Sequence, residues 1–130
     1  MHSEVADSWI MQAQTGTAAS FLELISVFPS LRARDLLRQI VGVSERTLKA
    51  QVAQDRSAPL TREQSKRAEQ VSEILSQAAK VLGSAAAADV WMTRKVIVLD
   101  NMTPLEMMVT PAGSLALHDH LVRIEYGVYC

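Results

Sequence analysis

Cysteine, aromatic residues and long apolar runs are all scarce in this sequence. The one cysteine among 130 residues is Cys130, so no disulfide bond can form within the chain. Aromatic residues make up 5% of the sequence against 48% for all hydrophobic types, so the core must consist mostly of aliphatic side chains and methionine. No apolar run reaches the ~18 residues of a membrane-spanning helix, and no basic stretch precedes an apolar one near the N-terminus. We therefore expect a cytoplasmic protein that can bury a core without disulfides or metal.

Patterns that would indicate catalysis or metal binding are also missing. The sequence contains no phosphate-binding glycine loop, no paired catalytic carboxylates and no Ser-His-Asp order. His118 and His120 flank Asp119, but residues two apart on a helix point to different faces, whereas metal-binding pairs there are four apart. Cys130 has no histidine or basic neighbour in sequence that would activate its thiol. We therefore expect a protein that is not an enzyme and that uses neither a cofactor nor a metal.

What the sequence does contain is the period of amphipathic helices, repeated along nearly its whole length. Ser44 and Ser84 can each cap a first helical turn, and Thr61 and Thr103 can open capping boxes. Residues 95–99 read as an extended connection, because no partner strand is visible. The predicted fold class is all-α, with about eight short helices. They are expected at residues 4–14, 17–28, 31–41, 44–54 and 62–82, after Ser84, from Pro104, and from Pro111 to the end of the chain.

Charge is distributed unevenly, although the net charge is only −1. Between Leu31 and Arg67 there are nine basic and four acidic residues, a balance of +5, while the remainder of the chain carries −6. A basic segment within an acidic protein indicates a local surface for a polyanion such as DNA. An ordinary solvated helical face would give the same composition, so charge alone leaves both interpretations open.

Residues 36–48 resemble a helix-turn-helix. A first helix ends at Gly42, a short turn follows, and a second helix begins after Ser44 with polar side chains near its start. If this second helix entered the major groove, Arg46 could bond a guanine while later basic residues contacted phosphates. A plain helical corner without a ligand is the alternative. The candidate DNA-binding residues are Arg46, Thr47, Lys49 and Arg56.

A further set of residues, most of them in the second half of the chain, forms a recognisable pattern. It consists of Val43-Ser-Glu-Arg-Thr-Leu48, the helix from Leu60 to Leu82, Ala88-Asp-Val-Trp91, Leu99, Thr103-Pro-Leu105, Thr110, Gly113 and Arg123-Ile-Glu-Tyr-Gly-Val128. Together these residues resemble the Xre/MbcA/ParS family of antitoxins. The resemblance covers roughly residues 31–128, and its C-terminal half is the more specific.

The resemblance implies a helix-turn-helix-like region followed by a toxin-binding domain. It also implies a RES-domain toxin as partner, which breaks down NAD or transfers its ADP-ribose to a protein, and whose NAD cleft receives the C-terminal end of the antitoxin. We expect three domains: a helix-turn-helix-like region (31–58), a toxin-binding domain (60–130) and, outside the resemblance, an N-terminal helical extension for dimerisation or packing (1–30). The implied toxin-binding residues are Trp91, Arg123, Glu125, Tyr126, Gly127, Val128, Tyr129 and Cys130.

We therefore expect the antitoxin of a type II toxin–antitoxin system, which binds and occludes the NAD-binding cleft of a cognate RES-domain toxin. Operator DNA is a further candidate partner, because an antitoxin can also repress its own operon. Apolar stripes on nearly every predicted helix favour a homodimer that assembles with the toxin into a larger hetero-oligomer. The alternative is a stand-alone helix-turn-helix transcriptional regulator whose C-terminal part only dimerises.

Overall fold

Most of the expected helices are present in the computed structural model, which describes residues 16–127. Within that range there are seven α-helices, two short 3₁₀ helices and no strand; extended backbone pairs only at two isolated bridges. The all-α prediction is confirmed, and the helix expected over residues 4–14 lies outside the described residues. The elements are α2 (Ala18–Val27), η2 (Pro29–Asp35), α3 (Leu37–Val41), α4 (Glu45–Gln54), α5 (Arg62–Leu82), α6 (Ala85–Met92), η3 (Ile97–Leu99), α7 (Pro104–Met107) and α8 (Pro111–Glu125).

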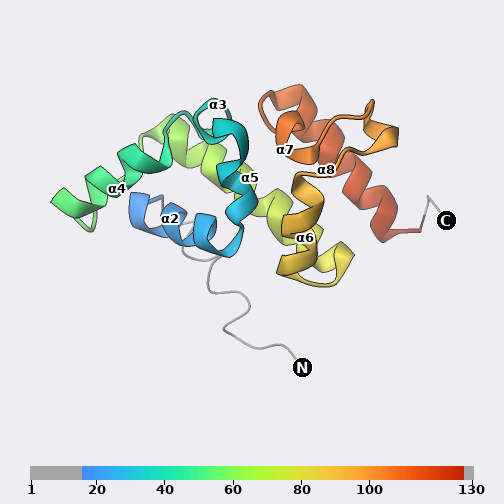
Figure 1. Ribbon diagram of the computed structural model, residues 1–130, viewed down its shortest axis with the longest axis horizontal. Coiled ribbons are helices and arrows are strands. Elements are labelled where there is room, and N and C mark those ends of the chain that lie inside the picture. The colour runs from blue at the N-terminus through green and yellow to red at the C-terminus, as the bar shows by residue number, and fades with distance from the viewer. Residues whose placement is uncertain (1–15, 128–130) are drawn as a thin grey trace.

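The other helices are arranged around α5, the longest one (Figure 1). Its 21 residues correspond to a length of about 32 Å. The helices α2, α3 and α4 lie toward its N-terminal half, and α6, α7 and α8 lie toward its C-terminal half (Figure 1). Both α6 and α8 pack directly against α5, whereas α4 packs against α2. One hydrophobic cluster connects the two groups, from Phe21 on α2 to Leu121 on α8.

Local sequence sets where the helices begin, as the capping residues predict. In the capping box of α7, the Thr103 hydroxyl accepts the Glu106 N–H at 3.1 Å, and the Glu106 carboxylate accepts the Thr103 N–H at 2.9 Å. Thr61 forms the same arrangement at the start of α5. Ser44 and Ser84 cap α4 and α6 through their side-chain oxygens. These side chains satisfy backbone N–H groups that have no partner within the helix.

The stretch before α4 differs from the expected structure. One continuous helix is expected over residues 31–41, but the chain forms η2 and then the five-residue α3, with a left-handed φ of 56° at Asp35. Pro29 has no N–H to donate, and the N–H of Ser30 is donated to the Asp89 carboxylate on α6 at 2.8 Å. The expected helix is therefore interrupted at Asp35, because a left-handed residue does not continue a right-handed helix.

The segment after α6 is also only partly as expected. The N–H of Val96 donates to the carbonyl of Met102 at 3.1 Å, so Val96 is extended but pairs with a residue of the same loop. Residues 97–99 turn as η3 and are not extended. Asp100 and Asn101 then reverse the chain with left-handed φ values of 58° and 60°, which these two residue types tolerate better than most.

Candidate functional site

The N-terminal half of α8 is held firmly against the rest of the protein. The hydroxyl of Thr110 accepts the Gly113 N–H at 3.0 Å and so caps the helix. Leu117 and Leu121 are completely buried on its inner face. A Cβ atom on Gly113 would lie 2.0 Å from the carbonyl oxygen of Met107, so glycine is what allows α7 and α8 to approach this closely.

The C-terminal end of α8 presents Arg123, Tyr126 and Gly127, three of the predicted toxin-binding residues. Tyr126 directly follows the last helical residue and is 77% exposed. The Arg123 Nε atom lies 3.1 Å from the Asp119 carboxylate one turn earlier. Gly127 has a left-handed φ of 72°, a conformation that ends helices and redirects the backbone. The remaining predicted residues, Val128, Tyr129 and Cys130, lie outside the described residues.

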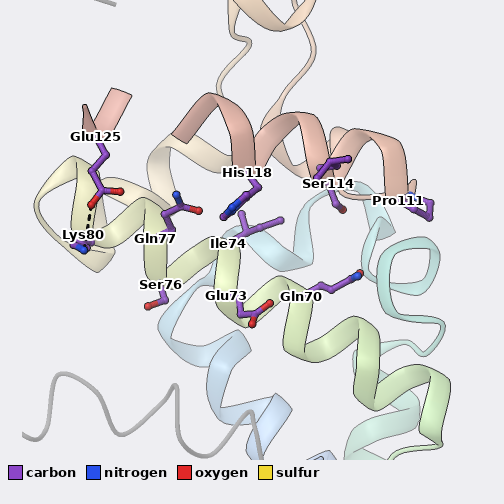
Figure 2. Close-up of a pocket in the computed structure, with 11 residues that line it drawn as sticks. Gln70, Glu73, Ile74, Ser76, Gln77, Lys80, Pro111, Ser114, His118 and Glu125 are labelled. Carbon is purple, nitrogen blue, oxygen red and sulfur yellow. Dashed lines mark ion pairs between the residues drawn. The ribbon is translucent and has the colours of Figure 1, made fainter. Parts of the chain in front are cut away.

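Glu125, also a predicted toxin-binding residue, faces α5 (Figure 2). Its carboxylate lies 3.2 Å from the Lys80 ammonium group, at one end of a groove of about 780 Å³ between α5 and α8. The aliphatic side chains of Ile74 and Leu115 line the groove, and Leu115 is 70% exposed. The complete lining is Gln70, Glu73, Ile74, Ser76, Gln77, Lys80, Pro111, Ser114, Leu115, His118 and Glu125.

This groove is absent from the sequence-based expectations, because its two walls come from helices far apart along the chain. One signal for it is visible in the sequence of α8. Leu115 lies two residues before Leu117, so it falls outside the buried face that Leu117 and Leu121 form.

Trp91, the first of the predicted toxin-binding residues, lies on α6 and is half-buried. Its ring is parallel to the His120 ring within 3°, with the two centroids 6.5 Å apart. His120 is buried, and this burial lowers the pKa of its imidazole below the ordinary value of 6.5. Trp91 therefore packs against the buried side of α8, whereas Tyr126 lies at its exposed end.

All four candidate DNA-binding residues are exposed. Of the ten residues of α4, only Leu48 is fully buried, so most of the surface of this helix faces solvent. A left-handed Gly42, with φ 97°, ends α3 directly before the Ser44 cap, which is the turn that the sequence predicts. Three of the candidates, Arg46, Thr47 and Lys49, belong to α4, and Arg56 lies in the loop that follows it.

Charges near the start of α4 are partly neutralised by Glu45. Its carboxylate accepts the Arg32 Nε–H at 3.0 and 3.1 Å, and the Lys49 ammonium group lies 3.6 Å away. Arg46 forms no ion pair within residues 16–127, so its guanidinium group is the more available of the two α4 cations. The side chain of Thr47 is engaged locally, because its hydroxyl accepts a hydrogen bond from Ser44 at 3.0 Å.

The two histidines of α8 point in different directions, as their spacing predicts. His118 is exposed at the groove, whereas His120 is buried beside Trp91. In the part of the chain that the structure describes, no three metal-ligating side chains come together. No helix of the same part is both long and apolar enough to span a membrane.

The part of the chain that contains α8 matches a known protein family. Residues 77–127 match the family described as Antitoxin Xre/MbcA/ParS C-terminal toxin-binding domain. This part of the chain is therefore similar to the toxin-binding domain of the Xre/MbcA/ParS antitoxins. The family resemblance seen in the sequence is thereby confirmed. The matched residues contain the end of α5, all of α6, α7 and α8, and the turn at Gly127.

A curated relative extends the similarity beyond this domain. Antitoxin Xre of Pseudomonas putida (strain KT2440) is 30% identical over 82 residues. The aligned part covers 63% of this chain and 50% of the relative. The chain therefore spans about half the length of the Xre/MbcA/ParS antitoxin that it matches.

Proposed function

We propose that this protein is an antitoxin that binds a RES-domain toxin and inhibits it by placing its own C-terminal end in the toxin's NAD-binding cleft. The proposed activity is binding without catalysis. The match of residues 77–127 to the Xre/MbcA/ParS toxin-binding domain supports a toxin as the partner. The RES class and the NAD cleft rest on the resemblance of the sequence motifs, which continues to Val128.

The observation that carries this proposal is the exposed end of α8. A helix that buries Leu117 and Leu121 ends in Tyr126, a large aromatic side chain that is 77% exposed. Tyrosine is enriched at protein interfaces because it has a large apolar ring and one polar group. This end belongs to the residues that match the toxin-binding domain. We therefore assign Tyr126 and its neighbours Arg123 and Gly127 to the toxin contact.

The same residues are suited to closing a concave site. Ligand pockets are mostly apolar with a few polar groups, and an inserted segment binds more tightly when it is already ordered. The capped and packed α8 supplies that order up to Tyr126. The left-handed Gly127 then permits a change of direction that a residue with a side chain adopts less easily. Occupying the cleft in this way excludes NAD.

The test uses the RES-domain protein encoded next to this gene, co-expressed and purified with the antitoxin. Removing residues 127–130 should leave the thermal stability almost unchanged, because these residues follow the last helical turn. The shortened protein should still bind the toxin through the remaining surface of the domain. It should nevertheless fail to stop NAD consumption. Gly127→Trp should have the same effect by blocking entry into the cleft.

Two outcomes would contradict the proposal at different levels. If the shortened protein both binds and fully protects, the inhibition comes from another surface or from holding the toxin in an inactive shape. If the full-length protein does not bind the RES-domain toxin at all, the assignment of the partner itself is wrong.

We propose DNA binding by α4 as a second function, in which the antitoxin represses its own operon. The observation in its favour is that α4 buries only Leu48 and leaves Arg46 exposed at its first turn. A helix anchored by one side and polar on the other fits the role of a recognition helix. The same observation is compatible with a stand-alone regulator, which differs by having no toxin partner. A homodimer, also proposed here, would match a palindromic operator.

A further inference from the structure

We infer that the groove between α5 and α8 is the docking site of this chain's own N-terminal segment, residues 1–15, which lie outside the described residues. The segment would bind as an amphipathic helix with Val5, Trp9 and Ile10 against Ile74 and Leu115. This inference concerns the isolated protein and does not depend on the proposed toxin.

The position where the described chain begins supports this occupant. The carbonyl of Gly16 accepts the Leu60 N–H at 2.8 Å, beside the first turn of α5. A Cβ on Gly16 would lie 2.7 Å from the Ser65 hydroxyl, so residue 16 is held against α5 itself. Ser65 precedes Gln70, where the groove begins, by five residues, or about 7.5 Å along the helix. The described chain therefore begins against α5, about 7.5 Å along the helix axis from the start of the groove.

The length of the segment matches the length of the groove. The α5 wall runs from Gln70 to Lys80, which is about 15 Å at the helical rise of 1.5 Å per residue. The helix that the sequence predicts over residues 4–14 would be about 16 Å long. A segment that runs back from Gly16 would place its C-terminal end near Gln70 and Trp9 near the middle of the groove.

The chemistry of the two surfaces is also complementary. Leu115 leaves 70% of its surface exposed although it lies on a helix with a well-packed inner face. The N-terminal segment contains one of only two tryptophans in a protein with 5% aromatic residues. Covering Leu115 with Trp9 would remove apolar surface of both from water. The polar rim of Gln70, Gln77 and Ser114 faces the groove and could bond the polar side of the docked helix.

The middle of the groove is distant from the proposed toxin contact, because Tyr126 lies eleven residues beyond Leu115, or about 16 Å along α8. A segment that fills the groove as far as Lys80 and Glu125 would end beside Tyr126.

The test is tryptophan fluorescence of the full chain carrying Trp91→Phe, which keeps an aromatic ring beside His120 and leaves Trp9 as the only tryptophan. A free peptide of residues 1–15 is the reference for an undocked Trp9. We expect the emission maximum of Trp9 in the full chain to lie at a shorter wavelength than that of the peptide. Acrylamide should quench the fluorescence of the full chain several-fold more weakly than that of the peptide. Leu115→Glu should restore the values of the peptide, while Ile97→Glu, at an exposed apolar residue away from the groove, should not.

Peptide-like emission in the full chain, or emission that Leu115→Glu leaves unchanged, would overturn the inference. A return to peptide-like quenching on dilution would also overturn it, because the groove would then hold the segment of a second copy. If Trp91→Phe does not fold, deletion of residues 1–14 from the unsubstituted chain replaces it. The deletion should raise the fluorescence of a bound hydrophobic dye, and Leu115→Glu should cancel most of that rise; no rise on deletion overturns the inference.

Discussion

Helices α4 and α8 each expose a surface that a partner could use, but they do so with opposite chemistry. Helix α4 fully buries one side chain, Leu48, and presents charged groups to solvent. Among these, Glu45 forms ion pairs with Lys49 of the same helix and with Arg32. Helix α8 buries Leu117, His120 and Leu121, yet leaves Leu115 and Tyr126 in solvent.

The difference matters because exposed charge is ordinary on a protein surface, whereas two large hydrophobic side chains exposed on one well-anchored helix are less so. The α4 surface is therefore compatible with DNA binding or with simple solvation. The α8 surface is better explained by partners that cover it. Four experiments test this difference between α4 and α8.

Tyr126→Ala should have the largest effect, on binding of the RES-domain toxin. Buried aromatic contacts at interface centres cost about 2–4 kcal/mol when truncated, or roughly 30- to 1,000-fold in affinity. The free energy of unfolding of the isolated protein should change little, because Tyr126 is mostly exposed. Calorimetric titration of toxin measures the first quantity and urea unfolding the second. Ile97→Ala serves as control, and an equal loss of affinity there would argue against a contact centred on the end of α8.

Gly113→Ala should strongly destabilise the protein. The added Cβ would meet the Met107 carbonyl oxygen at 2.0 Å, so α7 and α8 must move apart. Overpacking of this kind lowers the free energy of unfolding by about 1–3 kcal/mol, and contact with rigid backbone favours the upper end. Ala116→Ser, on the exposed side of the same helix, should change it by less than about 0.5 kcal/mol. Equal urea midpoints for both variants would mean that the anchoring of α8 is looser than its contacts indicate.

Arg46→Ala tests whether the polar surface of α4 has a partner at all. If Arg46 contacts a base, the variant should lose roughly 1–3 kcal/mol of operator binding and specificity at one position. Lys49→Ala should weaken binding at all sequences and flatten its salt dependence, because a phosphate contact releases counterions. Gel-shift titration with the promoter of the operon measures both. Absence of any shift at low salt, even with toxin present, would leave α4 as a solvated face.

The smallest effect is expected for the pH dependence of the free energy of unfolding, through His120 on the inner side of α8. Burial lowers the pKa of His120 below 6.5, so the unfolded chain binds this proton more readily than the folded one. The stability that neutral His120 contributes is fully present above about pH 6.5 and is lost as the pH falls below that value through the lower pKa of the folded state. Urea unfolding between about pH 7 and about pH 5 should show this decline, and His120→Gln should reduce it. His118→Gln, at an exposed position of the same helix, should leave the decline unchanged.

Sequence-based prediction succeeded where a structure depends on residues three or four apart. The capping boxes of Thr61 and Thr103 and the glycine that ends α5 are examples, because their hydrogen bonds close within one helical turn. It failed over residues 31–41, where the left-handed φ of 56° at Asp35 divides the expected helix into η2 and α3. Local spacing also does not indicate that Trp91 packs on buried His120 or that Glu125 pairs with Lys80, because both contacts join helices that are distant in the chain.

The all-α class, most helix ends, the basic segment and the resemblance to the Xre/MbcA/ParS antitoxins follow from the sequence alone, because each of these depends on local spacing or on short motifs. Which face of each helix stays exposed depends on the tertiary structure. Leu115 and Leu117 are the same residue type two positions apart, yet one is 70% exposed and the other completely buried. Their difference arises from where α5 and α7 pack against α8, and that packing depends on contacts between residues that are distant in the chain.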